Sequence, residues 1–250
     1  MVTTDGGTIV ASGDPSSQET VTLTFSFSYT SIVVEKTISI YIADTLTLDV
    51  NPYRTYSGSS SVSVSELRLI HHTNVYQRAQ AKLTVSFSLV SVSDLVVTHY
   101  STSDYSTNDD TILTMSAITG SIDLYVTPVS GGTTTIVGTF GSWLTSNDYT
   151  ITVLDSEYAL ISSMILSRSS ILVTGLLDSV HDDLTLYVEF DDGTIFENAR
   201  TLDWISTDLY IDFVSSISSE IVVDTLGEMT LKDNSESPTY VFLSCLCLAT

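Results

Sequence analysis

The side chains of this sequence that could do chemistry are carboxylates that occur close together. Asp155 and Glu157 are separated by one residue, and Asp182 and Asp183 are adjacent further along the chain. Ca²⁺ takes about six to eight oxygen ligands, and loops where modules join often gather such oxygens. The four side chains therefore form a candidate Ca²⁺ site, and Ca²⁺ is the one cofactor that the sequence suggests. The alternative is that they are solvated turn residues, since no EF-hand pattern accompanies them.

Catalytic motifs are not evident in the sequence. Two carboxylates at a fixed separation serve glycoside hydrolysis, but a pair carries no weight in a chain with 30 acidic residues. His71 and His72 are expected on a strand, where adjacent residues face opposite sides, which argues against a shared metal. The sequence has no phosphate-binding glycine loop, nucleophile elbow or HExxH motif. We expect no enzymatic activity.

The charge balance excludes two classes of partner. The 250 residues include 8 basic and 30 acidic side chains, which gives a formal net charge of −22. Nucleic-acid binding and attraction to anionic lipid both need basic patches, and this chain has too few basic residues to build one. No apolar run reaches the length of a membrane span in this segment. The acidic surface favours a soluble protein, and we expect an extracellular or cell-surface location.

Three similar stretches indicate how the chain folds. Residues 23–28, 83–88 and 184–190 each place apolar residues on one parity and hydroxyl or charged residues on the other. In the first stretch, Leu23 and Phe25 continue the parity of Val21. A period of two is the pleat of a β-strand with one face on a core and the other in water. The sequence therefore predicts an all-β fold of sandwich modules.

The spacing of strands and turns predicts three parts. Residues 1–45 hold a β-hairpin over 21–29 and 32–42, and 46–154 and 155–250 each contain several short strands separated by turn residues, as in a β-sandwich. An Asp-Gly pair between alternating strands, at Asp192-Gly193, is the strongest hairpin signal.

The order of elements at the two ends of the chain predicts incomplete modules. Residues 5–23 and 226–243 both read as a turn glycine, a short strand, a polar loop with proline and a long strand. Residues 1–45 therefore resemble the closing strands of a module, and 155–250 resemble a module without its last strand. Cys245 and Cys247 lie too close together on one predicted strand to pair well with each other.

The third part resembles a known family. The residues are LTLYVEFDDGTIFENA at 184–199, WISTD at 204–208 and VVDTLGEMTL at 222–231. Their order of strand, DGT turn, tryptophan and glycine turn is similar to that of tandem immunoglobulin-like modules of the bacterial, invasin type. The resemblance implies immunoglobulin-like β-sandwiches in tandem, which in that family form stalks, adhesins or filaments outside the cell.

Two hypotheses for function follow from these features. The first is a non-enzymatic structural protein, with partners that are adjoining modules of a longer chain or further copies of itself. If the partners are further copies, the hairpin at 21–42 would be donated head-to-tail to a neighbouring subunit. The other hypothesis is an adhesin or receptor module that recognises a glycan or protein through a loop at 101–110, with Tyr105 exposed and Ca²⁺ involved.

Overall fold

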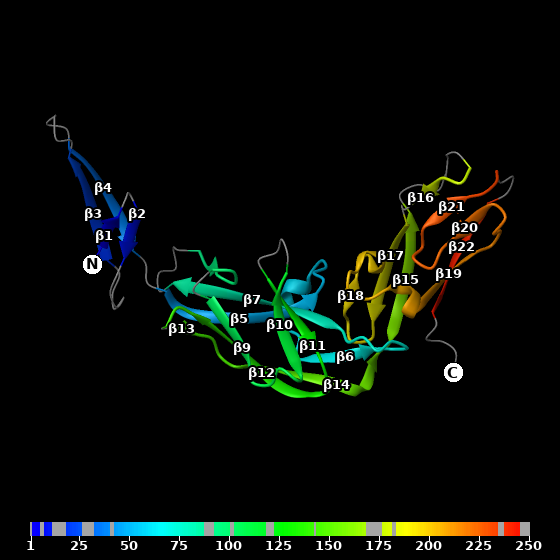
Figure 1. Ribbon diagram of the computed structural model, residues 1–250, viewed down its shortest axis with the longest axis horizontal. Helices are drawn as coiled ribbons and strands as arrows, with labels where there is room; N and C mark the ends of the chain where they lie inside the picture. The colour runs from blue at the N-terminus through cyan, green and yellow to red at the C-terminus, as the bar shows by residue number, and fades with distance from the viewer. Residues whose placement is uncertain are drawn as a thin grey trace. The chain divides into compact units, whose positions relative to one another are not determined.

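The described part of the protein is built almost entirely of β-strands (Figure 1). The computed structural model describes residues 2–5, 8–11, 19–26, 33–40, 43–87, 93–100, 103–118, 123–142, 144–168, 177–181, 184–234 and 238–245. Within these ranges the only helical segments are three short 3₁₀ turns. The prediction of an all-β fold is therefore confirmed.

The bounds of the elements are as follows. The strands are β1 (Val2–Asp5), β2 (Thr8–Ala11), β3 (Glu19–Ser26), β4 (Val33–Ile40), β5 (Ala43–Tyr53), β6 (Glu66–Ile70), β7 (Arg78–Phe87), β8 (Leu95–Val96), β9 (Ser103–Thr107), β10 (Leu113–Ala117), β11 (Leu124–Pro128), β12 (Gly132–Phe140), β13 (Leu144–Thr145), β14 (Tyr149–Ala159), β15 (Ile161–Arg168), β16 (Val180–His181), β17 (Leu184–Phe190), β18 (Ile195–Phe196), β19 (Ile211–Ser215), β20 (Ile221–Val223), β21 (Met229–Leu231) and β22 (Val241–Cys245). The 3₁₀ turns are η1 (Ser59–Ser61), η2 (Ala199–Thr201) and η3 (Thr207–Leu209).

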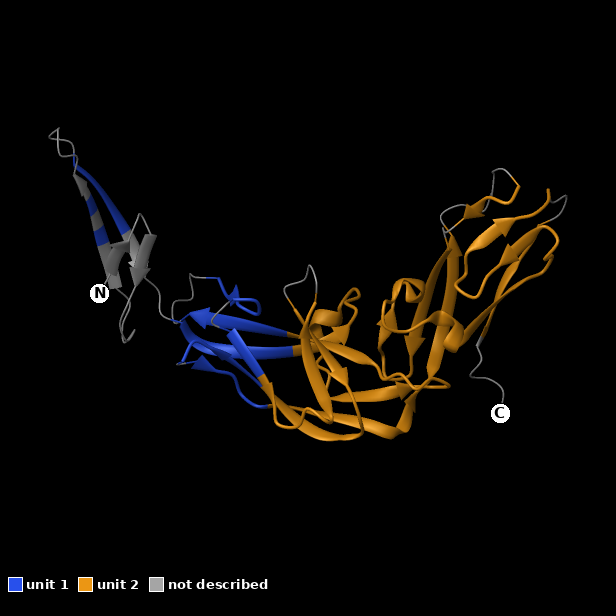
Figure 2. Cartoon of the chain, in the orientation of Figure 1, with its two compact units in different colours: residues 1–49, 82–105, 137–148 blue, residues 50–81, 106–136, 149–250 orange. Residues whose placement is uncertain are grey.

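The chain divides into two compact units (Figure 2). Unit 1 comprises residues 1–49, 82–105 and 137–148, and unit 2 comprises 50–81, 106–136 and 149–250. Strands β5, β7, β9 and β12 contribute residues to both units, and β14 runs through position 154. The predicted division into 1–45, 46–154 and 155–250 stays a prediction.

Unit 1 contains the predicted N-terminal hairpin. Strands β3 and β4 pair antiparallel from Glu19↔Ile40 to Ser26↔Val33, which confirms the hairpin. In the rest of the unit, β8 pairs with β7 and β13 pairs with β12. Leu83 and Val85 of β7 are buried, as the alternation of residues 83–88 predicted.

The first half of unit 2, which is the part before Leu160, contributes strands to two sheets. Their strand orders are β10-β11-β7-β5, with β8 beside β7, and β13-β12-β14-β6, with β9 beside β12. Inward-facing side chains from both sheets are fully buried, including Val50, Leu67, Val126 and Ile151. Strand β6 lies parallel to β14, and their register shifts between Leu154 and Tyr158.

The second half of unit 2 follows β14. Its sheets are β15-β17-β18, β16-β21-β20 and β19-β22. In β17 every second residue is buried, namely Leu184, Leu186, Val188 and Phe190, so the alternation predicted for this strand is confirmed. Leu186, Val188 and Phe190 belong to one hydrophobic core. That core also contains aromatic side chains from the segments after β17, namely Phe196, Tyr210 and Phe213.

The predicted Asp-Gly hairpin is also confirmed. Strand β17 pairs with β18 through the turn at 191–194, where Gly193 has a φ of 82°. Glycine fits this left-handed conformation because it has no Cβ. The carboxylate of Asp192 closes the turn by accepting a hydrogen bond from the backbone N–H of Thr194, at 2.8 Å.

The prediction of a loop over 101–110 was wrong for its central part. Residues Ser103–Thr107 form strand β9, which pairs with β12. The exposure along β9 alternates between half-buried and exposed, and none of its residues is fully buried. A strand at such a position needs no apolar stripe, because pairing with β12 satisfies its backbone. Its polar composition therefore concealed it.

Candidate functional site

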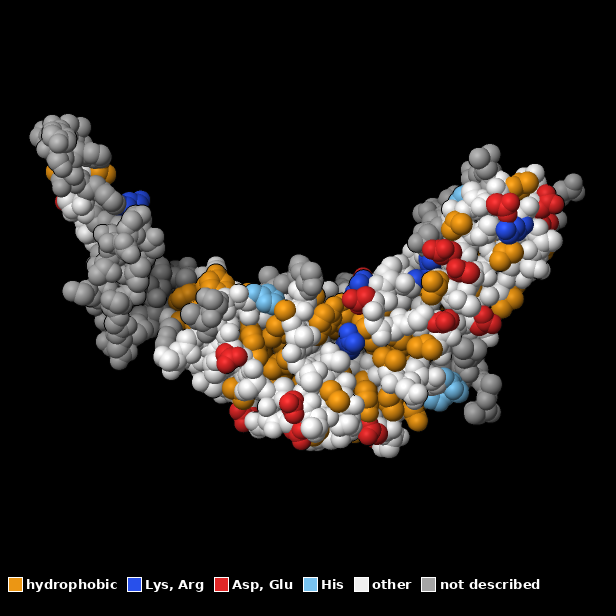
Figure 3. All heavy atoms as spheres, viewed as in Figure 1, with side chains coloured by type: hydrophobic (Ala, Val, Ile, Leu, Met, Phe, Trp, Pro, Cys, Tyr) orange, Lys and Arg blue, Asp and Glu red, His pale blue; other side chains and the backbone are white. Residues whose placement is uncertain are grey.

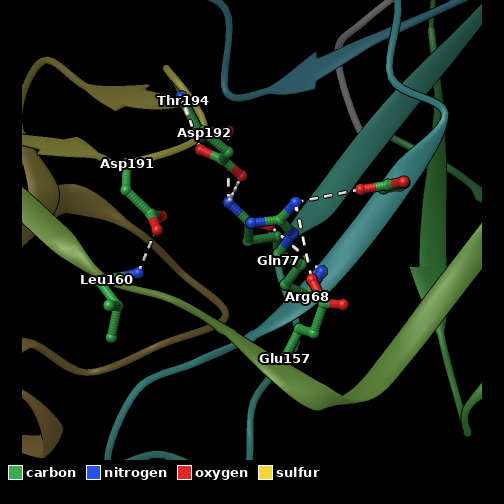
Figure 4. A network of polar contacts seen from close by, with 8 residues as sticks. Arg68, Gln77, Glu157, Leu160, Asp191, Asp192 and Thr194 are labelled. Atoms are coloured by element: carbon green, nitrogen blue, oxygen red, sulfur yellow. Dashed lines mark hydrogen bonds and ion pairs between the residues drawn. The ribbon is translucent and has the colours of Figure 1, made fainter.

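A polar junction joins the two halves of unit 2, which precede and follow Leu160. We define the junction as Arg68, Gln77, Leu160, Asp191 and Asp192 (Figure 4). Leu160 is the single residue between β14 and β15. Its backbone N–H donates to Asp191 Oδ1 at 3.0 Å, and the backbone N–H of Asp191 donates to the carbonyl oxygen of Leu160 at 2.8 Å. This reciprocal pair fixes the chain where one half ends and the other begins.

Gln77 is the buried centre of the junction. Its side chain is 2% exposed and lies directly before β7. Nε2 donates to Asp192 Oδ2 at 2.7 Å and to Thr194 Oγ1 at 3.2 Å. Oε1 accepts from the backbone N–H of Arg68 at 3.2 Å. Because a buried amide needs partners for both of its donors and for its acceptor, the arrangement satisfies Gln77 fully.

Arg68 carries the positive charge of the junction. Its Nη2 lies 3.1 Å from Glu66 Oε2 and 3.9 Å from Glu157 Oε2. The hydrogen bond to Glu66 and the nearby carboxylates of Glu157 and Asp192 raise the pKa of Arg68 against the opposing effect of burial. The guanidinium therefore stays charged and offsets part of the surrounding negative charge.

A second group of contacts at the junction is aromatic. The guanidinium carbon of Arg78 lies 5.7 Å from the ring centre of Tyr125 and 5.3 Å from that of Trp204. A cation over an aromatic face is attracted by the ring's negative charge density. The hydroxyls of Tyr53 and Tyr125 are 3.0 Å apart, and Tyr125 also donates to Asp203 Oδ2 at 3.3 Å. The hydrogen bond with Tyr53, followed by burial, raises the pKa of Tyr125 to about 12.

The segment after β5 adds polar contacts to the turn and strand of the second half. Ser57 donates its backbone N–H to Glu197 Oε1 at 3.0 Å, and Tyr56 donates its hydroxyl to the carbonyl oxygen of Gly193 at 3.2 Å. Burial, followed by the charge of Asp192, raises the pKa of Tyr56. The junction is thus contacted from β6, from the start of β7 and from this segment.

The junction leaves a polar cavity of about 290 Å³. Its lining includes Pro52, Glu66, Arg68, Gln77 and Asp192. The polar side chains among these residues already hydrogen-bond within the chain. The geometry therefore fits a structural joint.

The four residues of the predicted Ca²⁺ site have different outcomes. Asp182 and Asp183 lie outside the described residues. Asp155 accepts a hydrogen bond from the Tyr76 hydroxyl, and Glu157 lies near Arg68. Among the residues that the structure describes, no three His, Cys, Asp or Glu side chains gather in a way that would hold a metal ion. The Ca²⁺ site stays a prediction.

Two other candidates are placed differently from what the sequence predicted. His71 and His72 follow β6 in a turn, where His72 has a φ of 63° and their rings lie 4.1 Å apart, so the prediction that they lie on a strand was wrong. Tyr105 is half-buried in β9 and donates its hydroxyl to the carbonyl oxygen of Thr98 at 2.7 Å. This hydroxyl is therefore engaged within the chain. Cys247 lies outside the described residues.

Sequence reasoning missed most of the junction. It identified Asp191 and Asp192 as the hairpin turn and named Trp204 only within the motif of the resemblance, but it did not find Arg68, Gln77 or Arg78. One signal was present: of five arginines in the chain, three lie between positions 54 and 78. In a strongly acidic protein, such a local gathering of scarce cations marks a place where they have specific partners.

Carboxylates are the commoner charged groups on the described part of the visible face. Figure 3 shows them over much of this face, with few basic groups among them. Among the described residues, no helix is long and apolar enough to cross a membrane.

Comparisons of this chain with known proteins find matches among solved structures. No family model matches the chain, and no curated protein matches it. The crystal structure of the S-layer protein rSbsC(31–844) matches at 11% identity and a TM-score of 0.31, covering 98% of this chain and 35% of that chain. The structure of surface layer protein SbsC, domains 1–6, matches at 12% identity and a TM-score of 0.30, covering 98% and 35%. The chain therefore spans about a third of the length of the solved structures that it matches.

Proposed function

We propose that this chain is a non-enzymatic structural protein of the cell surface, made of tandem immunoglobulin-like β-sandwich modules in a stalk or filament. The observation that carries the proposal is the passage of β14 into β15 with Leu160 alone between them. That passage is held by the reciprocal hydrogen bonds of Leu160 and Asp191. A stalk or filament needs successive modules at a fixed angle, and such a joint supplies it.

The physical contrast is with a flexible linker. A Gly/Ser-rich linker behaves as a random coil and leaves adjacent modules free to reorient. Here one strand ends and the next begins within a single residue, and the buried Gln77 connects the two sides. Reorientation would leave the buried Gln77 amide without its partners, which is unfavourable for a buried polar group. The joint therefore resists bending.

The charge of the chain supports the proposed location. A net charge of −22 keeps the protein soluble and repels it from nucleic acid and anionic lipid. Such a surface suits a protein that stands in the medium outside a cell.

Two arrangements would use such modules. In one, the chain is a segment of a longer tandem protein, and its partners are the adjoining modules. In the other, copies of the chain assemble head-to-tail through the N-terminal hairpin. Intact mass of the mature protein separates them: a mass near 27.1 kDa in an assembled state supports the second arrangement, and a much larger parent supports the first.

Labelling of intact source cells tests the proposal. Antibodies against residues 50–234, applied without permeabilisation and viewed by immunogold electron microscopy, should label surface layers, stalks or filaments. Brief protease treatment of the intact cells should remove the label. Label that appears only after permeabilisation would contradict the proposed function.

A further inference from the structure

An apolar outer face on the β19–β22 sheet has no role in the core. We define this face as Val214, Tyr240 and Phe242, which are 46%, 60% and 54% exposed. Val214 stands opposite Phe242 in the strand register, and the rings of Tyr240 and Phe242 lie 6.2 Å apart. Their neighbours Phe213 and Leu243 pack on the core instead. The outer face is therefore a cluster of large apolar side chains left in water.

The N-terminal hairpin carries apolar side chains of the same kind. Within the described residues, β3 and β4 form a two-stranded sheet that no third strand joins. Val33 and Val34 of β4 are 56% and 49% exposed. A two-stranded hairpin alone in water is at best marginally stable, so a second surface that covers it would stabilise it.

The two surfaces carry opposite charges at corresponding distances from their exposed valines. The hairpin bears Lys36, one of three lysines in the chain, two positions after Val34. The β19–β22 sheet bears one charged residue, Asp212, two positions before Val214. Residues two apart on a strand share a face and lie about 7 Å apart. With the valines in contact, Lys36 can therefore lie opposite Asp212, and the structure leaves both side chains exposed.

We propose that the β3–β4 hairpin of one copy of this chain packs on the apolar outer face of a second copy, with Val34 against Val214 and Phe242 and with Lys36 opposite Asp212. This inference rests on the proposed structural function and specifies the partner surface for its self-assembling form. The contact joins two different surfaces, so it is heterologous, and a heterologous contact that does not close on itself produces an open filament.

Sedimentation velocity of the full chain over roughly a hundredfold range of concentration tests the contact. We expect the wild type to form larger species as concentration rises. Val34→Asp and Phe242→Asp should each hold the protein at the monomer mass of 27.1 kDa. Ile165→Asp is the matched control, because Ile165 is also exposed, at 55%, but lies on β15. It should assemble as the wild type does, and circular dichroism checks that each variant folds.

Charge reversal tests the orientation. Lys36→Glu and Asp212→Lys should each weaken assembly, and the double variant should recover it. A photo-crosslinking residue at position 34, in a mixture of isotopically light and heavy copies, should form cross-links to the segment around Phe242 in a different copy. Cross-links confined to one copy would overturn the proposal, because the hairpin would then cover its own chain.

A monomer at every concentration, or assembly that neither aspartate variant affects, would also overturn the contact. These outcomes are distinguishable from failure of the proposed function. A monomeric chain that immunogold labelling still places in surface structures removes the contact and leaves the structural function standing. Absence from the surface contradicts that function whatever sedimentation shows.

Discussion

Gln77 Nε2 lies 2.7 Å from Asp192 Oδ2, although 115 residues separate the two in sequence. The bond connects the residue before β7 with the turn after β17, across the joint at Leu160. Because Gln77 is almost fully buried, loss of the bond would take a partner from a buried amide donor. The two residues therefore couple the halves of unit 2.

Gln77→Ala should lower the free energy of unfolding by about 1–3 kcal/mol, because the Asp192 carboxylate and the Arg68 N–H each lose a buried partner. Urea denaturation measures the change. Asp110→Ala, at an exposed position, is the control and should change stability by less than about 0.5 kcal/mol. Equal effects of the two variants would mean that Gln77 does not hold the junction.

The coupling itself is measurable in a double-mutant cycle. Gln77→Ala and Asp192→Ala together should destabilise less than the sum of the two single changes, with a coupling free energy of about 0.5–3 kcal/mol. Strict additivity would contradict a direct interaction.

Removal of the Arg78 cation should alter the environment of Trp204. In a Trp143→Phe background Trp204 is the sole tryptophan, so its fluorescence reports this site. Arg78→Met should shift the emission and lower stability by about 0.5–2 kcal/mol, since the cation no longer lies over the indole. Lys232→Met, which removes a cation paired with Asp178 elsewhere, should leave the emission unchanged.

Tyrosine ionisation should show the raised pKa values of Tyr125 and Tyr76. In absorbance near 295 nm, both should ionise late, each with a pKa of about 12, while burial raises the pKa of Tyr210 still further. Tyr125→Phe should remove one of the late-ionising groups. Because folding raises the pKa of Tyr125 from 10.0 to about 12, its contribution to stability is complete below pH 10 and is lost as the pH rises through 12. A variant with the same titration curve as the wild type would refute the assignment.

Alanine substitutions at two glycines with nearly equal φ values distinguish the cost of backbone strain from the cost of steric crowding. Gly193 and Gly227 have φ values of 82° and 79°. Alanine at either position should cost about 1–2 kcal/mol from the left-handed backbone alone. At Gly227 a Cβ would also lie 2.8 Å from Arg200 Nε and 2.9 Å from Phe213 Cζ, whereas nothing lies within 4 Å at Gly193.

Gly227→Ala should therefore be more destabilising than Gly193→Ala by about 1–3 kcal/mol, as overpacking usually is. Thermal or urea unfolding of both variants gives the comparison. A loss at Gly193 that equals the loss at Gly227 would show that the neighbours of Gly227 move aside freely.

Much of the fold could be predicted from local patterns. The alternation in β17 predicted which side chains are buried, because one face of that strand packs on the core. The Asp-Gly turn and the β3–β4 hairpin were predicted from residues next to one another in the chain. Strand β9 was missed because its stability comes from pairing with β12, which polar composition does not reveal.

The junction could not be predicted for a different reason. Gln77 is polar, and a polar residue outside an alternating strand is normally assigned to the surface. Its burial depends on Asp192 and Thr194, which come more than a hundred residues later. Arg78 likewise depends on Trp204. A single sequence carries no signal for such distant pairs beyond the gathering of arginines.

Hydrogen exchange at Leu160 tests the account most directly, because its amide is bound to Asp191 at the joint. If the joint is rigid, the Leu160 amide should exchange about as slowly as that of Val188 in the core strand β17, through unfolding of the whole unit. Gln77→Ala should speed exchange at Leu160 more than at Ile151. Exchange of Leu160 in the wild type as fast as that of an exposed turn amide would show a flexible joint and contradict the account.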